Sequence, residues 1–163
     1  KMAVSKTEEF TTGSSFHRLM WDDAQHGNSD TQLVPDAKIK RVVMCSGKVY
    51  YDLLEERDAR GIDDVYLLRF EQFYPFPAQS AVAELERFKQ AEMVWCQEEP
   101  KNQGAWTFIE PNLEWVLGRI KAKHTRPVYV GRATSASPAT GLASNHKAQQ
   151  AALVNDALTI KGK

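Results

Sequence analysis

The chain is poor in the features that mark several common classes of protein. It contains only two cysteines, Cys45 and Cys96, each in or beside an apolar run typical of a strand. Two cysteines exclude a disulfide-rich scaffold, and we expect both thiols to be buried and free. They lack metal-ligand spacing, and none of the four histidines completes a cluster with them. No apolar run approaches the roughly 20 residues that a membrane-spanning helix needs.

An excess of charge of one sign is also missing. Lys and Arg together number 21, as do Asp and Glu, so the formal net charge is zero. A neutral chain has no broad positive field, and we therefore expect neither nucleic acid nor a membrane as a partner. The 163 residues suffice for one domain with a sizeable core. The chain begins with Lys1 rather than methionine, so we expect a piece of a longer protein.

The hydrophobic pattern divides the chain at residue 39. Residues 1–39 are polar and aperiodic, with scattered bulky apolar residues, and this favours a connector that packs on a neighbouring domain. In residues 40–163, short apolar runs alternate with helical periodicity. Strands are expected at 41–45, 65–70, 93–97 and 127–131. Helices are expected at 49–60, around 82–88, from about 103 and around 151–158. This alternation predicts an α/β three-layer sandwich with a mostly parallel sheet.

The turn Ser46-Gly47-Lys48 joins the first predicted strand to the first helix. A helix amino terminus with a lysine can bind an anion such as a phosphate. The turn lacks the several glycines of a phosphate-binding loop, so a plain tight turn with a solvated lysine is the alternative.

The run from Cys96 to Trp106 combines two carboxylates, an amide pair and a glycine between a strand and a helix. Glu98 and Glu99 could act as acid and base, but neighbours in an extended segment point to opposite sides. We therefore expect one of them to cap the next helix or to pair with Lys48 or Arg132, and the other to reach a subunit interface.

Asn102 to Trp106, the second half of this run, could contact another subunit or could belong to the local helix and core. Asn102 is a candidate cap for the helix that follows, which is expected to begin near Gln103 and to be kinked or divided by Pro111. Trp106 is either an interface anchor or simply part of the core.

A last candidate follows the fourth strand. Arg132 could bind a carboxylate or phosphate, and residues 133–144 have almost no bulky side chains. The alternative is a plain surface loop. The histidines stand beside no convincing nucleophile, so we expect them to be solvated or at an interface.

Four motifs, at matching order and spacing, resemble the C-terminal region of the decarboxylating first component of the 2-oxoglutarate dehydrogenase complex. They are RVVMCSGKVYYDL at 41–53, RFEQFYPFP at 69–77, the run at 95–106, and YVGR at 129–132 with SASPATG at 135–141 and His146. The resemblance implies a transketolase C-terminal-like domain, with an antiparallel edge strand added to the parallel sheet.

The same resemblance implies an enzyme that oxidatively decarboxylates 2-oxoglutarate with thiamine diphosphate and magnesium. The enzyme would succinylate the lipoyl group of dihydrolipoyl succinyltransferase, its partner in the complex. The chain has no Gly-Asp-Gly segment followed by paired asparagines, which hold the cofactors in this family. We therefore expect the cofactors and all catalytic residues in domains that this chain lacks.

What remains for this domain is assembly of a homodimer and the binding of an effector such as acetyl-CoA or AMP. Lys48 and Arg132 are our candidates for the effector phosphate. Our candidates for interface contacts are Glu98, Asn102, Gln103 and Trp106. The rival hypothesis is a free-standing Rossmann-like module that binds a nucleotide. We expect a cytoplasmic location in a bacterium, or the mitochondrial matrix for a eukaryotic relative.

Overall fold

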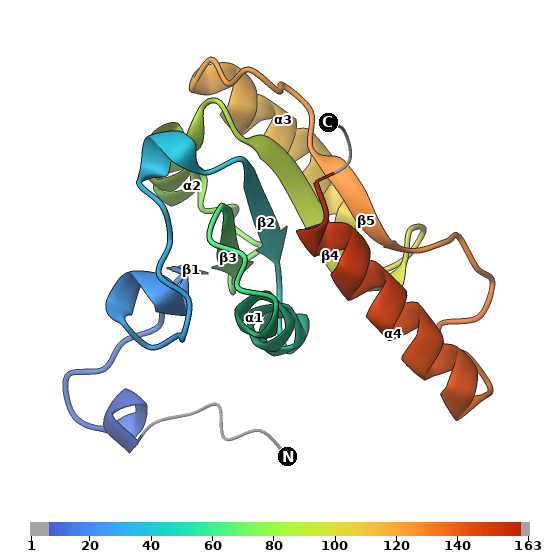
Figure 1. The fold of residues 1–163 in the computed structure, drawn as a ribbon. Helices are drawn as coiled ribbons and strands as arrows, with labels where there is room; N and C mark the ends of the chain where they lie inside the picture. Colours follow the sequence, from blue (N-terminus) through green and yellow to red (C-terminus); the bar gives the residue numbers. More distant parts are fainter. Residues whose placement is uncertain (1–6, 161–163) are drawn as a thin grey trace.

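A computed structural model of the chain describes residues 7–160 and shows an α/β fold built on one five-stranded sheet (Figure 1). The strands are β1 (Leu19–Met20), β2 (Arg41–Cys45), β3 (Val65–Phe70), β4 (Glu92–Pro100) and β5 (Val128–Arg132). The α-helices are α1 (Val49–Ala59), α2 (Ala78–Leu85), α3 (Trp106–Arg119) and α4 (Ala143–Leu158). Short 3-10 helices lie at η1 (Thr7–Phe10), η2 (Asp23–His26), η3 (Asp36–Lys38) and η4 (Glu86–Phe88).

The strand order is β1-β3-β2-β4-β5, with β1 antiparallel to β3 and the other pairs parallel. The expected antiparallel edge strand is therefore present, and residues 19–20 form it. Helices α2 and α3 pack on one face of the sheet, and α1 and α4 pack on the other. This confirms the predicted three-layer sandwich.

Strands β2 and β3 are buried along their whole length because helices cover both of their faces. Cys45 and Cys96 are buried free thiols, as expected. The one charged residue of β2, Arg41, is also buried, and its Nη1 donates to the carbonyls of Asp156, Ala157 and Thr159. An arginine at these carbonyls satisfies the carboxyl end of α4 and holds that helix on the sheet.

Several details differ from the sequence expectations. Strand β4 continues to Pro100, with an irregular register against β5 after Gln97, so the paired glutamates lie within the strand. Helix α3 begins at Trp106 and runs undivided through Pro111. On α4 the buried residues include Val154 and Leu158, but Ala151 is exposed, because Leu153 and Ala157 complete the inner face instead.

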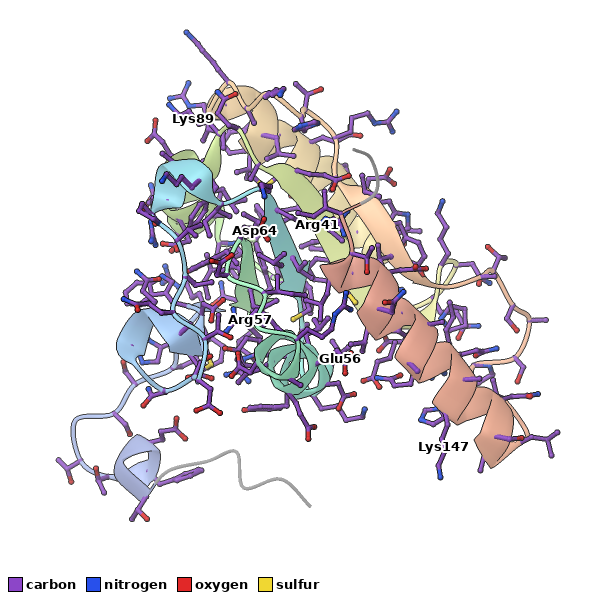
Figure 2. The ribbon with its side chains drawn as sticks, in the orientation of Figure 1. Arg41, Glu56, Arg57, Asp64, Lys89 and Lys147 are labelled. Carbon is purple, nitrogen blue, oxygen red and sulfur yellow. The ribbon has the colours of Figure 1, made fainter. Side chains whose placement is uncertain are left out.

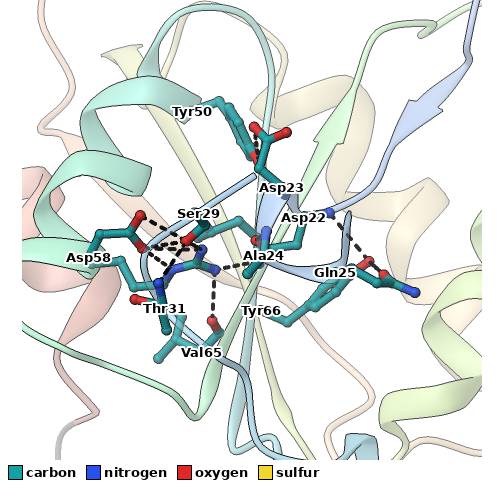
Figure 3. A network of polar contacts seen from close by, with 12 residues as sticks. Asp22, Asp23, Ala24, Gln25, Ser29, Thr31, Tyr50, Asp58, Val65 and Tyr66 are labelled. Atoms are coloured by element: carbon teal, nitrogen blue, oxygen red, sulfur yellow. Dashed lines mark hydrogen bonds and ion pairs between the residues drawn. The ribbon is translucent and has the colours of Figure 1, made fainter. Parts of the chain in front are cut away.

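Part of the expected connector is packed into the α/β fold (Figure 3). Asp22 is fully buried and forms an ion pair with Arg57 of α1, which is also fully buried. The Oδ2 atom of Asp22 accepts a hydrogen bond from the backbone N–H of Leu67 at 2.7 Å. The backbone N–H of Asp23 donates to the Tyr50 hydroxyl at 2.9 Å. The predicted boundary at residue 39 therefore falls after residues that already contact the sheet.

Two of the labelled charged residues lie in opposite environments (Figure 2). Arg57 lies inside, between α1 and the amino-terminal segment, whereas Lys147 points away from α4. Removing two charges from water costs free energy, and only close, well-oriented contacts between the two side chains offset that cost. The contacts of Asp22 and Arg57 thus fix where residues 19–31 lie.

Candidate functional site at the carboxyl edge of the sheet

Two neighbouring strands of the sheet are followed by helices on opposite faces. Strand β2 leads to α1 on one face, and the adjacent β4 leads to α3 on the other. In open α/β sheets a crevice forms at such a point, outside the carboxyl ends of the strands. A pocket of about 530 Å³ opens here. Its lining residues are Ser46, Gly47, Lys48, Phe73, Trp95, Gln97, Glu98, Glu99, Gly104, Ala105 and Phe108.

One side of this switch-point pocket is aromatic. The rings of Phe73 and Trp95 meet edge to face, with centroids 6.1 Å apart. Phe108, on the first turn of α3, lines the pocket and is 41% exposed. Such a surface suits an apolar group, with polar contacts only at the floor and rim.

The floor is organised by Gln97, whose side chain is 4% exposed. Its Oε1 accepts hydrogen bonds from the indole N–H of Trp95 and from the backbone N–H of Trp106, both at 3.0 Å. Its Nε2 donates to the carbonyls of Glu99, Pro100 and Gln103. One amide thus caps the start of α3 and shapes the connection that precedes it.

The rim carries the charges. Lys48 donates to Glu98 Oε1 at 2.5 Å and lies 3.8 Å from Asp52. Glu98 is partly buried by this contact, whereas Glu99 is exposed. The expected pairing of one glutamate with Lys48 is therefore present, and this ion pair engages the Glu98 carboxylate.

Asn102 does not cap a helix, contrary to the expectation. Its side chain accepts from the Ser135 N–H at 3.0 Å and donates to the Ser135 carbonyl at 2.9 Å. Gln103 donates to the same carbonyl at 3.1 Å. The cap fails because α3 starts at Trp106, where Gln97 already satisfies the backbone N–H. These two amides instead tether the loop after β5.

Trp106 belongs to the core. It is 5% exposed and packs against Tyr129, with ring centroids 5.2 Å apart. The Tyr129 hydroxyl donates to the Arg132 carbonyl at 2.8 Å, and burial raises the pKa of Tyr129 to about 12. A Cβ at Gly131 would lie 2.5 Å from that hydroxyl and 2.7 Å from the backbone carbonyl oxygen of Gln97 in the neighbouring strand, so this position of β5 requires glycine.

Arg132 lies at a second, smaller pocket of about 300 Å³, which residues 133–135 and 137–140 line together with Pro100 and Gln149. Its Nη2 is 2.9 Å from the Nδ1 of His146 and donates to Gln150 Oε1 at 3.3 Å. Its Nε is buried and has no hydrogen-bond acceptor among the described residues. Lys48 and Arg132 thus line different pockets, and the structure does not bring them together in one.

The described residues were also compared with the requirements of a metal site and of a membrane-spanning helix. Between residues 7 and 160, no three His, Cys, Asp or Glu side chains are grouped to hold a metal ion. No helix in the same span is long and apolar enough to cross a bilayer. All four histidines are exposed.

Sequence reasoning missed Gln97, Tyr129 and Phe108. The signal for Gln97 was present, because a strand places it on the same face as Trp95, two residues earlier, where a lone polar side chain needs partners. The roles of Tyr129 and Phe108 depend on how β5 and α3 pack, which periodicity does not reveal.

Comparison with known proteins identifies the family. A family model described as 2-oxoglutarate dehydrogenase C-terminal matches residues 4–158. The 2-oxoglutarate dehydrogenase E1 components of Brucella anthropi and Brucella ovis are each 65% identical over 159 residues, and that of Brucella abortus is 64% identical. These matches cover 97% of this chain but 16% of each relative. The chain therefore belongs to the 2-oxoglutarate dehydrogenase C-terminal family.

Proposed function

We propose that this chain works as the C-terminal domain of a thiamine-dependent 2-oxoglutarate dehydrogenase E1 component. In its complete form, that protein would decarboxylate 2-oxoglutarate oxidatively within the tricarboxylic acid cycle. It would pass the succinyl group to the lipoyl group of dihydrolipoyl succinyltransferase. The supporting observation is the 65% identity to E1 components over 97% of the chain. The same match favours this function over a free-standing nucleotide-binding module.

The described residues do not fit thiamine diphosphate with magnesium. No metal-binding group of acidic and histidine side chains is present between residues 7 and 160. The lysine at the switch-point pocket is already paired with carboxylates that would repel a diphosphate. We therefore propose that both cofactors are bound by parts of the polypeptide outside this chain, and we assign no catalytic step to its residues.

For this domain we propose a role in assembly of a homodimer. Glu98, Asn102 and Gln103 have partners within the chain, and Trp106 is buried. They would therefore support an interface by holding the β4–α3 connection in one shape for a neighbouring domain to contact. The free thiols fit a reducing compartment, which supports a cytoplasmic location.

Effector binding is proposed separately for the two cations. A phosphate at Lys48 must displace Glu98, whereas one at Arg132 could use the Nε that has no acceptor. Either would raise the melting temperature of the protein when acetyl-CoA or AMP is added. Lys48→Ala and Arg132→Ala, made separately, would show which pocket is used. An unchanged melting temperature with both ligands contradicts the proposal.

The main experiment compares the full-length polypeptide with the 163-residue chain. We expect the full-length protein to reduce ferricyanide with 2-oxoglutarate only when thiamine diphosphate and Mg²⁺ are added. The isolated chain should show no activity and no binding of thiamine diphosphate by calorimetry. Activity of the isolated chain, or a full-length protein that does not turn over 2-oxoglutarate, would refute the proposal.

A further inference from the structure

Arg132, at the carboxyl end of β5, carries a charge that no carboxylate of the described residues neutralises. The three buried arginines, Arg41, Arg57 and Arg69, each form an ion pair with a carboxylate. Arg132 instead contacts a histidine ring and a neutral amide, and its buried Nε has no acceptor between residues 7 and 160. A guanidinium in this state binds an added oxyanion favourably, through charge-assisted hydrogen bonds.

The smaller pocket beside this side chain, which we call the Arg132 pocket, suits such an anion. Its volume of about 300 Å³ is at the lower end of the range for ligand sites, so it fits one small group. None of the described residues that line it carries a carboxylate. Ser137 and Thr140 donate their hydroxyls to loop carbonyls, whereas the hydroxyls of Thr134 and Ser135 donate to no acceptor among residues 7–160. The lining therefore favours a small oxyanion.

His146, on the first turn of α4, links this pocket to pH. Its Nδ1 lies 2.9 Å from Arg132 Nη2, and because arginine has only donors, His146 must be neutral with its proton on Nε2. Histidine is the side chain that gains a charge between about pH 8 and pH 5. A proton on Nδ1 would set donor against donor, break the contact and leave two cations at the pocket. Lys147, the next residue on α4, is exposed and points away from the helix (Figure 2).

The acidic groups on the elements around this histidine are engaged elsewhere. On α1, Asp52 accepts from Gln150 Nε2 at 2.7 Å and lies 3.8 Å from Lys48. On β4, Glu98 is paired with the same lysine, and Glu99 lines the switch-point pocket. Within the described chain, no acidic residue of α1 or β4 forms an ion pair with the histidine or with the arginine. A second positive charge at the pocket would therefore need an anion from outside the chain.

We infer that the Arg132 pocket is a proton-linked binding site for a small oxyanion of the phosphate or sulfate class. At neutral pH the anion meets one cation, whereas at low pH the protonated His146 supplies a second charged donor. Because anion and proton each favour the binding of the other, the anion binds more tightly as pH falls. This site deepens the effector role proposed for Arg132 and rests on that proposal for the source of the anion alone.

Sulfate is the probe for this site, because it stays a dianion across the range in which histidine gains its charge. Its dissociation constant is measured by calorimetry on the full-length protein at about pH 5.5 and about pH 8, at constant ionic strength. We expect binding to be about tenfold tighter at the lower pH, which is the effect of one added charge-assisted hydrogen bond. Equal dissociation constants at the two pH values, or no binding at either, would overturn the inference.

Matched variants assign the proton to His146. His146→Gln keeps an acceptor for Arg132 but cannot gain a charge, so its dissociation constant should be the same at both pH values. His124→Gln should behave as the unmodified protein does, because His124 precedes β5 at the opposite edge of the sheet. Arg132→Gln should bind no sulfate. A pH dependence that persists in His146→Gln, or sulfate binding by Arg132→Gln, would each refute the assignment.

Competition by AMP identifies the source of the anion. We expect AMP to displace sulfate from the unmodified protein, as the phosphate group of a larger effector would. Failure of AMP to compete would indicate the free anion, and would contradict the effector role proposed for Arg132 without affecting proton-linked binding. Turnover of 2-oxoglutarate is measured on the same samples, so a failed anion site is distinguished from a failed enzyme function.

Discussion

Gln97 shows how one neutral side chain can organise a site that is surrounded by charges. Its amide makes five hydrogen bonds, two to donors and three to carbonyls of the β4–α3 connection. Because the side chain is almost fully buried, water cannot replace these bonds. Glu98 and Glu99 follow Gln97 directly, and the amide of Gln97 donates to the backbone carbonyl of Glu99.

Replacing Gln97 with leucine should destabilise the fold strongly. The indole N–H of Trp95 and the backbone N–H of Trp106 would lose their acceptor, at about 1–3 kcal/mol for each buried group. We expect the free energy of unfolding in urea to fall by about 3 kcal/mol or more. Gln103→Leu is the matched control, since it removes one partly buried bond and should cost about 1 kcal/mol or less. Equal effects of the two changes would contradict this role.

The two cysteines should be chemically silent in the folded chain. Burial raises the pKa of Cys96 from 9.0 to about 12 and that of Cys45 well above its usual range. At about pH 8 both are neutral thiols, which are poor nucleophiles. We expect iodoacetamide to label neither in the native chain and both in guanidinium, as read by mass spectrometry. Rapid native labelling would show that one is accessible.

The raised pKa values of the two thiols also determine how the free energy of unfolding changes at alkaline pH. Above pH 9 the unfolded chain releases thiol protons that the folded chain keeps, so the free energy of unfolding falls as pH rises toward 12.

At the scale of elements, the connection between β4 and α3 is constrained at Gly104. Gly104 has a φ of +64°, a conformation that side chains rarely adopt. A Cβ there would also lie 3.0 Å from Glu99 Cβ and 3.1 Å from Gln97 Nε2. The glycine thus lets the connection close over the amide of Gln97.

Gly104→Ala and Gly118→Ala should shift stability in opposite directions. The first introduces strain and crowding, and we expect a loss of about 1–3 kcal/mol. Gly118 lies in α3 with open space around it, so alanine should add up to about 1 kcal/mol through helix propensity. Thermal unfolding followed by circular dichroism compares the two. A tolerated Gly104→Ala would mean that the connection can relax.

At the scale of the whole molecule, the amino-terminal segment and the α/β core form one structure. Strand β1 extends the sheet, and Asp22 supplies the carboxylate for the buried Arg57. Tyr50 and Tyr66 bond to the same segment through their hydroxyls (Figure 3). The segment could still contact a neighbouring domain through its exposed side, where Phe16 and Trp21 lie.

Truncation tests where the folding unit begins. A chain that starts at residue 40 lacks Asp22, so Arg57 keeps only Asp58 as an ion-pair partner and the buried backbone N–H of Leu67 loses its acceptor, which together should cost about 3–5 kcal/mol. That is a large share of the roughly 5–15 kcal/mol that stabilises a typical domain. We expect this chain to lose its cooperative thermal transition, while a control chain that starts at His17 keeps it. Equal melting temperatures would instead support a boundary at residue 39.

The sequence alone did not locate strand β1, but it determined the order along the chain of the four longer strands and of the α-helices, the class of the fold and the free, buried cysteines. It did so because hydrophobic periodicity records which side of each local element is buried. For the paired glutamates, the sequence left three alternatives open, namely a helix cap, a pair with Lys48 or a pair with Arg132. Only the tertiary structure decided that Asn102 tethers a loop, that Gln97 caps α3, that Trp106 is core while Trp115 is exposed, and that Asp22 meets Arg57. Those outcomes depend on strand order, register and helix packing, which join residues far apart in the chain and leave no periodic trace in it.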